Sequence, residues 1–233
     1  MDLMNAGVMK GSDRSRLGTS LNLLYNYRNL RFRNELSYGK ITSNNSPYGP
    51  FSTYTYLNPY YYPYDASGNL KQVLFDNYTP ARGSSQVANP MYNTMLNTID
   101  QTTYDDFVDN FSVEWNIIQG LRLKGNFSLE RVNRSYDNFK PADHTDFIGK
   151  TEDKGSYTKG HTLQTSYDAN VVLSYFKQAG NYTLNLNAGW NIQESKSDYN
   201  AYTVYGFANQ SLNHPSLGVR FKEGDHVRGY ATT

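Results

Sequence analysis

The residues that could carry out acid–base or metal chemistry are few and widely spaced. No spacing typical of metal ligands connects the four histidines, His144, His161, His214 and His226. A glycosidase-like pair of carboxylates could be drawn from Asp105, Asp106 and Asp109, but acids clustered beside a strand are usually only solvated. No serine, histidine and acid arrangement and no glycine-rich phosphate cradle can be argued. We therefore expect that the chain is not an enzyme.

Binding chemistry is better represented, because one long polar segment is rich in tyrosine. A flat aromatic ring suits the face of a sugar, and the tyrosine hydroxyl adds a hydrogen bond at little entropic cost. These side chains are candidates for contact with a substrate or with a protein lid. The alternative is that they pack the segment against itself or enlarge an aromatic girdle. The six candidates are Tyr54, Tyr56, Tyr60, Tyr61, Tyr62 and Tyr64.

The same segment contains "YDASGNL", in which Asp65, Gly68 and Asn69 give a hint of a calcium loop. The further acidic positions and the terminal glutamate of an EF-hand are missing. An Asx-type turn explains the pattern better. We expect neither a metal nor a cofactor.

Alternating strands must position these side chains. In "NYTLNLNAGWNI", residues 181–192, apolar side chains from Tyr182 to Ile192 share one face, and polar side chains from Thr183 to Asn191 share the other. Strict alternation predicts a strand with one apolar and one wet face. The pattern alone leaves open whether the apolar face meets a protein core or a lipid bilayer.

Similar runs come in pairs and predict three β-hairpins, at about residues 18–39, 105–132 and 162–195, with turns at "RN", "QG" and "KQAGN". The final "HVRGYATT" predicts the start of a seventh strand. The segments that connect the hairpins are very long, and loops of such length are uncommon in compact soluble domains. Short turns on one side and long loops on the other favour an antiparallel transmembrane β-barrel with extracellular loops. The predicted loops cover about residues 40–103, 133–160 and 196–226.

Side-chain chemistry along the strands agrees with a barrel wall. Aromatic residues near the strand ends would form the girdles at the two membrane interfaces: Tyr27, Tyr38, Trp115, Tyr175, Tyr182 and Trp190. Charged side chains in the strand centres lie on the polar face, with the exception of Asp109. Charges that would face the lumen could line a substrate path, but pairing across strands or contact with a plug is the favoured reading: Arg31, Arg33, Glu35, Arg122, Lys124 and Glu130.

Composition limits the remaining function classes. The formal net charge of +1 gives no electrostatic case for binding nucleic acid, and the absence of cysteine removes disulfide frameworks. With a mean hydropathy of −0.72, no segment resembles a transmembrane helix. The alternative to a barrel segment is a soluble or cell-surface β-sandwich that binds carbohydrate through the tyrosine-rich segment. Dependence on detergent would separate the two.

Several runs together carry a family resemblance. These are "SPYGPFSTYTYLNPYYYPYDASGNL", "NPMYNTMLN", "FVDNFSVEWNIIQGLRLKGNFSLER" and "KGSYTKGHTLQTSYDANVVLSYFKQAGNYTLNLNAGWNIQE". From about residue 17 to about residue 207, the chain resembles the barrel of the SusC/RagA family of TonB-dependent outer-membrane transporters from Bacteroidetes. The resemblance implies import of glycans, peptides or other large nutrients through a plugged barrel in the outer membrane. It also implies a SusD-like lipoprotein lid and energy from TonB.

The chain departs from the whole of such a transporter. It shows no signal peptide, TonB box or plug domain, and six or seven strands are too few to close a barrel of the 22-stranded kind. An unclosed sheet would leave unpaired edges in lipid. We therefore expect an internal barrel fragment, residues 1–233, whose Met1 need not be the natural start and which transports nothing by itself. The TonB contact would be made by the missing N-terminal region.

Overall fold

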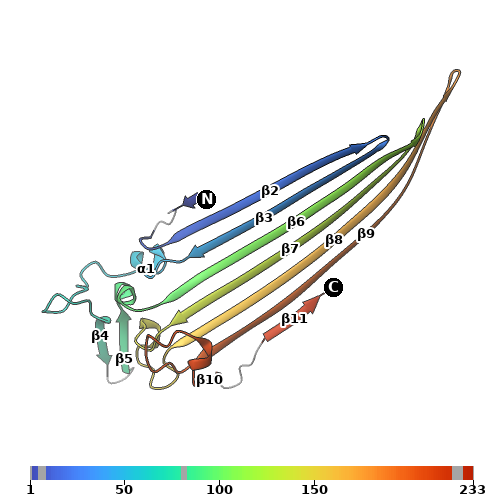
Figure 1. Ribbon diagram of the computed structural model, residues 1–233. Helices are drawn as coiled ribbons and strands as arrows, with labels where there is room; N and C mark the ends of the chain where they lie inside the picture. Colours follow the sequence, from blue (N-terminus) through green and yellow to red (C-terminus); the bar gives the residue numbers. More distant parts are fainter. Residues whose placement is uncertain (1, 5–8, 80–82, 222–227, 233) are drawn as a thin grey trace.

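One long antiparallel sheet dominates the computed structural model of the protein, which describes residues 2–4, 9–79, 83–221 and 228–232 (Figure 1). Six long strands follow one another as a meander, each antiparallel to the next: β2 (Asp13–Tyr27), β3 (Leu30–Asn44), β6 (Ile99–Ile118), β7 (Leu121–Lys140), β8 (Ser156–Ala179) and β9 (Tyr182–Tyr205). Three short strands flank them, with β1 (Asp2–Met4) along β2, and β10 (Arg220–Phe221) and β11 (Arg228–Thr232) along β9. The predicted all-β antiparallel class is confirmed, and β11 is the expected seventh strand.

Each hairpin closes through a two-residue turn. The strand ends face each other as Tyr27 with Leu30, Ile118 with Leu121 and Ala179 with Tyr182. Each turn contains a residue with positive φ, as the turns that match strand twist require: Arg28 at 53°, Gly120 at 85° and Gly180 at 60°. At Gly120 a Cβ would lie 2.1 Å from the carbonyl oxygen of Phe176, so this turn needs glycine for space as well as for conformation.

The strands are longer than the sequence pattern indicated. β8 and β9 each have 24 residues and β6 and β7 each have 20. At about 3.3 Å per residue, 24 residues extend about 80 Å, well beyond the thickness of a bilayer. The loops are correspondingly shorter, covering 45–98, 141–155 and 206–219, while 222–226 of the predicted third loop lies outside the described residues.

All three loops lie at the end of the sheet opposite the hairpin turns (Figure 1). The first loop contains a separate β4–β5 hairpin, and each loop contains at least one short helix. These elements are α1 (Phe51–Thr55), β4 (Val73–Thr79), β5 (Gly83–Ala88), η1 (Pro90–Met95), η2 (Thr145–Phe147) and η3 (Pro215–Leu217).

Among the described residues, the one cluster of buried apolar side chains also lies at the loop end. Phe139, Tyr157, Val204 and Phe207 form it, with the rings of Phe139 and Phe207 5.2 Å apart. The rest of the long sheet has no core of its own. No helix in the described part of the chain is long and apolar enough to cross a membrane.

The sheet is open at both sides within the described residues. Beyond Arg16, the outer edge of β2 has no partner strand, and on β9 the outer edge is paired only from Ser197 onward. The β4–β5 hairpin sits among the loops and not on a face of the long sheet (Figure 1). In the described part of the chain there is thus no second sheet of the kind that a β-sandwich would need.

Candidate functional site

The two faces of the long sheet differ sharply in chemistry. Directly opposed residues in an antiparallel pair share a face, so the register defines rows of side chains that cross all six strands. One such row on the apolar face is Tyr27, Leu30, Trp115, Leu123, Leu173 and Ala188. Its neighbours are similar, and large apolar side chains on this face are well exposed, including Trp190 at 66%. A continuous exposed apolar surface of this kind marks an interaction with lipid or protein.

The border of the apolar surface on the loop side is slanted relative to the register. It lies at Leu17 on β2 and at Ile192 on β9, whereas the β9 residue in the row of Leu17 is Asp198. The border therefore shifts by six residues, from 198 to 192, over the five steps from β2 to β9. With about 3.3 Å per residue and about 4.8 Å per strand step, this slope is about 40°. Strands of membrane barrels tilt by that amount.

The height of the surface fits the same geometry. On β2 the apolar side chains extend from Leu17 to Tyr27, and on β9 from Tyr182 to Ile192, which is ten residue steps in each case. Ten steps cover about 33 Å along a strand, or about 25 Å along the membrane normal at a tilt of about 40°. An apolar band of about 25 Å is typical of outer-membrane barrels. We call this surface the apolar band.

The predicted girdle residues all lie on the face of the apolar band. Tyr27, Trp115, Tyr175 and Tyr182 are near its turn-side border, and Tyr38 and Trp190 are near its loop-side border. Their role at membrane interfaces stays a prediction.

The charges predicted to face the lumen lie on the opposite, polar face, and four of the six bind neighbouring side chains. Arg33 pairs with Glu35, and Arg122 Nη1 lies 3.6 Å from Glu114 Oε1. Arg31 Nε donates to Asn26 Oδ1 at 3.1 Å.

Lys124 and Glu130 have no hydrogen bond or ion pair within the described part of the chain. The polar face is thus largely satisfied by its own cross-strand contacts, such as Asn126 Nδ2 donating to Asn170 Oδ1 at 2.8 Å.

Asp109, the predicted exception, does lie within the apolar band. Its carboxylate accepts a hydrogen bond from Asn34 Nδ2, which lies on the same face of the neighbouring strand. A hydrogen-bonded partner reduces the cost of a polar group in an apolar environment.

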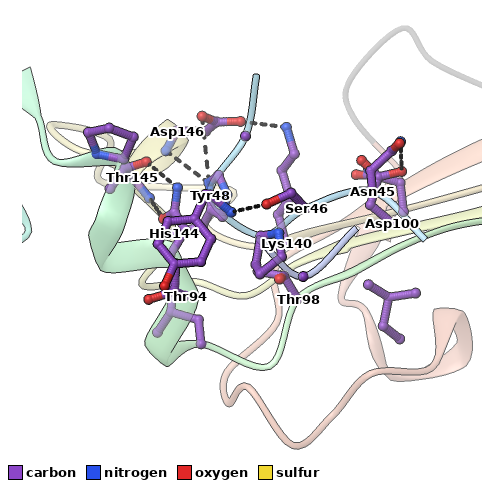
Figure 2. A pocket seen from close by; sticks show the side chains of 18 of the residues that line it. Asn45, Ser46, Tyr48, Thr94, Thr98, Asp100, Lys140, His144, Thr145 and Asp146 are labelled. Carbon is purple, nitrogen blue, oxygen red and sulfur yellow. Dashed lines mark hydrogen bonds and ion pairs between the residues drawn. The ribbon is translucent and has the colours of Figure 1, made fainter. Parts of the chain in front are cut away.

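A cavity of about 800 Å³ lies at the loop end, between the first and second loops (Figure 2). Many of the residues that line it are polar. Asn45 Nδ2 donates to Asp100 Oδ1 at 3.0 Å, and Lys140 Nζ lies 2.5 Å from Asp146 Oδ2. The ring of Tyr48 borders the same space. The cavity could hold a polar chain, such as part of a peptide or a sugar.

His144 forms part of this cavity as a helix cap. Its Nδ1 accepts a hydrogen bond from the backbone N–H of Asp146 at 3.1 Å, at the start of η2. Burial lowers the pKa of His144, and the Asp146 carboxylate only partly offsets that effect. His144 is therefore a neutral structural residue near pH 7.

Two asparagines hold the loops together. Asn89, which is 1% exposed, donates to the carbonyl oxygens of Pro63 at 3.1 Å and Lys71 at 2.7 Å. Asn93 exchanges two hydrogen bonds with Thr145 of the second loop, at 2.8 and 3.1 Å. Neither asparagine was identified as a site residue from the sequence, although both belong to the "NPMYN" run.

The six candidate tyrosines divide into two groups. Tyr54 donates to the carbonyl oxygen of Tyr48 at 3.0 Å, and Tyr61 stacks on Phe75 with ring centroids 5.5 Å apart. Tyr64 forms an isolated bridge with Leu70. These three pack the loop against itself.

Tyr56, Tyr60 and Tyr62 are exposed, and the first two are 90% and 91% exposed. They are the tyrosines that a ligand or a partner protein could reach.

Asp65 forms an Asx-type turn. Its Oδ1 accepts hydrogen bonds from the backbone N–H groups of Ser67 at 2.8 Å and Asn69 at 2.9 Å. These bonds, that from Asn69 foremost, lower the pKa of Asp65. No group of three or more potential metal ligands occurs in the portion of the chain that the structure describes.

Comparison with known proteins shows a likeness to solved structures. No protein-family model matches the chain, and no curated protein matches it. The chain is similar to a solved structure of the RagAB peptide importer in a closed-closed state, with a TM-score of 0.72, 17% identity and coverage of 95% of this chain and 25% of that chain. This chain has the fold of a segment of RagAB.

Two further RagAB structures agree. For the open-open state of the peptide importer the TM-score is 0.66 at 17% identity, and for a structure of the RagAB peptide transporter it is 0.68 at 18%; each match covers 94% of this chain and 25% of the other. At this level of identity the likeness concerns the fold. The chain spans about a quarter of the length of the RagAB chains, and the predicted resemblance to a SusC/RagA barrel is confirmed for the fold.

Proposed function

We propose that this chain forms part of the wall of a SusC-like, TonB-dependent importer in the bacterial outer membrane. The slanted apolar band carries the proposal, because a single sheet with a border sloping at about 40° fits the lipid-facing surface of a tilted barrel. The likeness to RagAB supports it. The open edges of β2 and β9 would be joined to further strands, since unpaired strand edges in lipid are prohibitively costly.

The substrate would pass along the polar face, in the lumen. RagAB is described as a peptide importer, which favours a peptide over a glycan as the imported nutrient. The cavity beside Tyr48 and the mixed charged and neutral hydrogen-bonding groups of the polar face are compatible with either. Within the whole importer, this chain would contribute to transport and not to catalysis.

The loop end would face outward and contact a SusD-like surface lipoprotein. Tyr56 and Tyr60 are suited to such a contact because their rings are exposed. They belong to the first loop, which lies at the end of the sheet opposite the turns (Figure 1). The contact with TonB would be made by a plug region beyond the barrel wall, and nucleic acid is not a partner.

The length and the cellular location of the native polypeptide test the proposal. An antibody against residues 46–70, applied to fractionated cells, should detect a polypeptide about four times longer than this chain in the outer membrane, because the chain spans 25% of the RagAB chains. Intact cells should bind the antibody. An epitope tag inserted between Gly180 and Asn181 should become accessible only after the membrane is opened. A water-soluble band near 26.6 kDa would overturn the proposal.

A further inference from the structure

A second depression lies on the face of the apolar band, at the loop-side border. It has a volume of about 240 Å³ and crosses four strands, β3, β6, β7 and β8. The side chains that line it on this face include Tyr38, Asp105, Phe107, Arg131, His161 and Leu163.

Aromatic side chains border the depression on its turn side, and polar side chains together with Leu163 border it on its loop side. Tyr38 and Phe107 lie opposite each other and are the last apolar residues of the band on β3 and β6. Arg131 is opposite Phe107 on β7, and Asp105 and His161 lie further toward the loops. This division matches an amphiphile whose acyl chain lies over the turn side and whose charged headgroup lies toward the loops.

Arg131 lines the depression, and Lys40 lies beside it, opposite Asp105; neither has an acidic partner within the described residues. Arg131 and Lys40 make no hydrogen bond or ion pair within the described residues. Two other basic side chains on the loop-side part of this face are paired: Lys196, in the row of Arg131, lies 3.8 Å from Asp198, and Lys159 lies 3.1 Å from Asp137.

A carboxylate and an amide, those of Asp105 and Asn133, also line the depression. Asp105 is opposite Lys40 and accepts a hydrogen bond from the hydroxyl of Tyr38 at 3.1 Å, so its carboxylate already has a donor. Asn133, which also lines the depression, has a buried Oδ1 with no hydrogen-bond partner in the described part of the chain. On this face, Arg131 and the adjacent Lys40 against Asp105 leave a net formal charge of +1 and one unused acceptor. Asp106, which also lines the depression, belongs to the polar face.

We propose that this depression binds the phosphate-bearing headgroup of an outer-leaflet lipid. Arg131 would hold the phosphate, because a guanidinium forms two parallel hydrogen bonds to phosphate oxygens. Phe107 and Tyr38, in the row of Arg131, would contact the first methylenes of the acyl chain. The headgroup would lie over Asn133, whose buried Oδ1 is an unused acceptor. The proposal rests on the proposed function, since it requires the apolar band to lie in a membrane.

Native mass spectrometry of the full-length protein, purified in detergent from outer membranes, tests the site. The wild-type protein should retain a phosphorylated lipid, and Arg131→Gln should reduce the retained fraction about tenfold, in keeping with the loss of a charge-assisted pair. Lys196→Gln is the matched control, because it removes a cation from the same row that is already paired with Asp198. It should leave retention unchanged.

Adding back defined compounds identifies the source of the phosphate. Lipid A and a glycerophospholipid are supplied separately to delipidated protein, with dephosphorylated lipid A and inorganic phosphate as comparisons. Binding of either phosphorylated lipid, but not of its dephosphorylated form, supports the proposal. Displacement of the lipid by millimolar inorganic phosphate would indicate a free-phosphate site and overturn it.

Equal lipid retention by Arg131→Gln and wild type, with both in the outer membrane, would overturn the lipid site alone. A water-soluble native protein would overturn the proposed function as well.

Discussion

Asn89 is the residue on which the shape of the first loop most depends. It is 1% exposed and joins Pro63, Lys71 and Met91 through its side chain. Asn89→Ala leaves two carbonyl oxygens and one N–H group without this partner, so the local free energy of unfolding should fall by about 1–3 kcal/mol. Hydrogen exchange of residues 60–75 in the full-length protein measures that loss.

Asn77→Ala is the matched control for this prediction. Asn77 lies in the same loop, is exposed, and makes no side-chain hydrogen bond in the described part of the chain. Its substitution should leave exchange unchanged. If both variants exchanged equally fast, Asn89 would not hold the loop together.

His144 gives the second loop a pH dependence. Burial lowers its pKa below the ordinary value of 6.5, so the unfolded loop binds a proton more readily than the folded loop. The folded second loop therefore has its full stability above about pH 6.5. It loses stability as the pH falls from there toward the lowered pKa of His144. Exchange protection factors of residues 141–155, corrected for intrinsic rates, should therefore decrease between pH 7.5 and pH 5.5.

The variant His144→Asn isolates the titration. Asparagine supplies a side-chain oxygen that can accept the cap hydrogen bond from Asp146 N–H but does not titrate. Protection in this variant should remain the same across the pH range. A fall in protection equal to that of the wild type would assign the pH dependence to another group.

Residue roles in the loops could not be derived from sequence for a physical reason. The partners of Asn89 lie 18 and 26 residues away, and the partner of Asn93 lies 52 residues away. The local sequence indicates at most the cap bond that Asn89 accepts from Met91 N–H and contains nothing about these distant partners. Asp65 was predictable as a turn because its partners are two and four residues away.

At the scale of single elements, the turns are the most demanding positions. Gly120 combines a φ of +85° with a Cβ position only 2.1 Å from Phe176 O. Gly120→Ala should therefore weaken the β6–β7 hairpin by at least about 1–2 kcal/mol from the left-handed conformation alone. The heat-resistant folded fraction of the full-length protein on a gel should fall. Gly18→Ala is the control, because no atom lies within 4 Å of the added Cβ, and the folded fraction should stay at the wild-type level.

Strand positions were predictable where one face is apolar, and strand ends were not. β6 begins at Ile99 and continues through "IDQTTYDD", where polar residues occupy both faces. Hydrogen bonding to β3 and β7 extends through this region, so neighbouring strands and not alternation define the element. The predicted hairpins consequently stop short of the loop end.

At the scale of the whole molecule, the antiparallel meander and its two-sided chemistry followed from the sequence, because period-two alternation and short turns fix both. The slope of the apolar border did not. That slope depends on the register between successive strands, such as Leu17 with Lys40 and Lys40 with Asp105, and single-strand patterns contain no register.

The slope of the apolar border allows a test that distinguishes a tilted membrane wall from an upright sheet. Thr19 and Lys196 lie in one row on the same face, yet Thr19 is inside the apolar band on β2 and Lys196 is beyond its border on β9. The chain has no cysteine, so a spin label introduced at either position is unique within it. In the full-length protein in bilayers, a label at Thr19→Cys should be reached preferentially by oxygen, which partitions into lipid. A label at Lys196→Cys should be reached preferentially by a water-soluble nickel complex.

Val171→Cys and Asn170→Cys provide the internal reference for the two faces, since these neighbours on β8 point to opposite sides. The first should behave as lipid-exposed and the second as lumen-exposed. If the labels at 19 and 196 gave the same result while the reference pair alternated, the sheet would meet lipid without the tilt of about 40° that a closed barrel requires. The slanted border would then have a different cause, and the barrel-wall assignment would lose the observation that carries it.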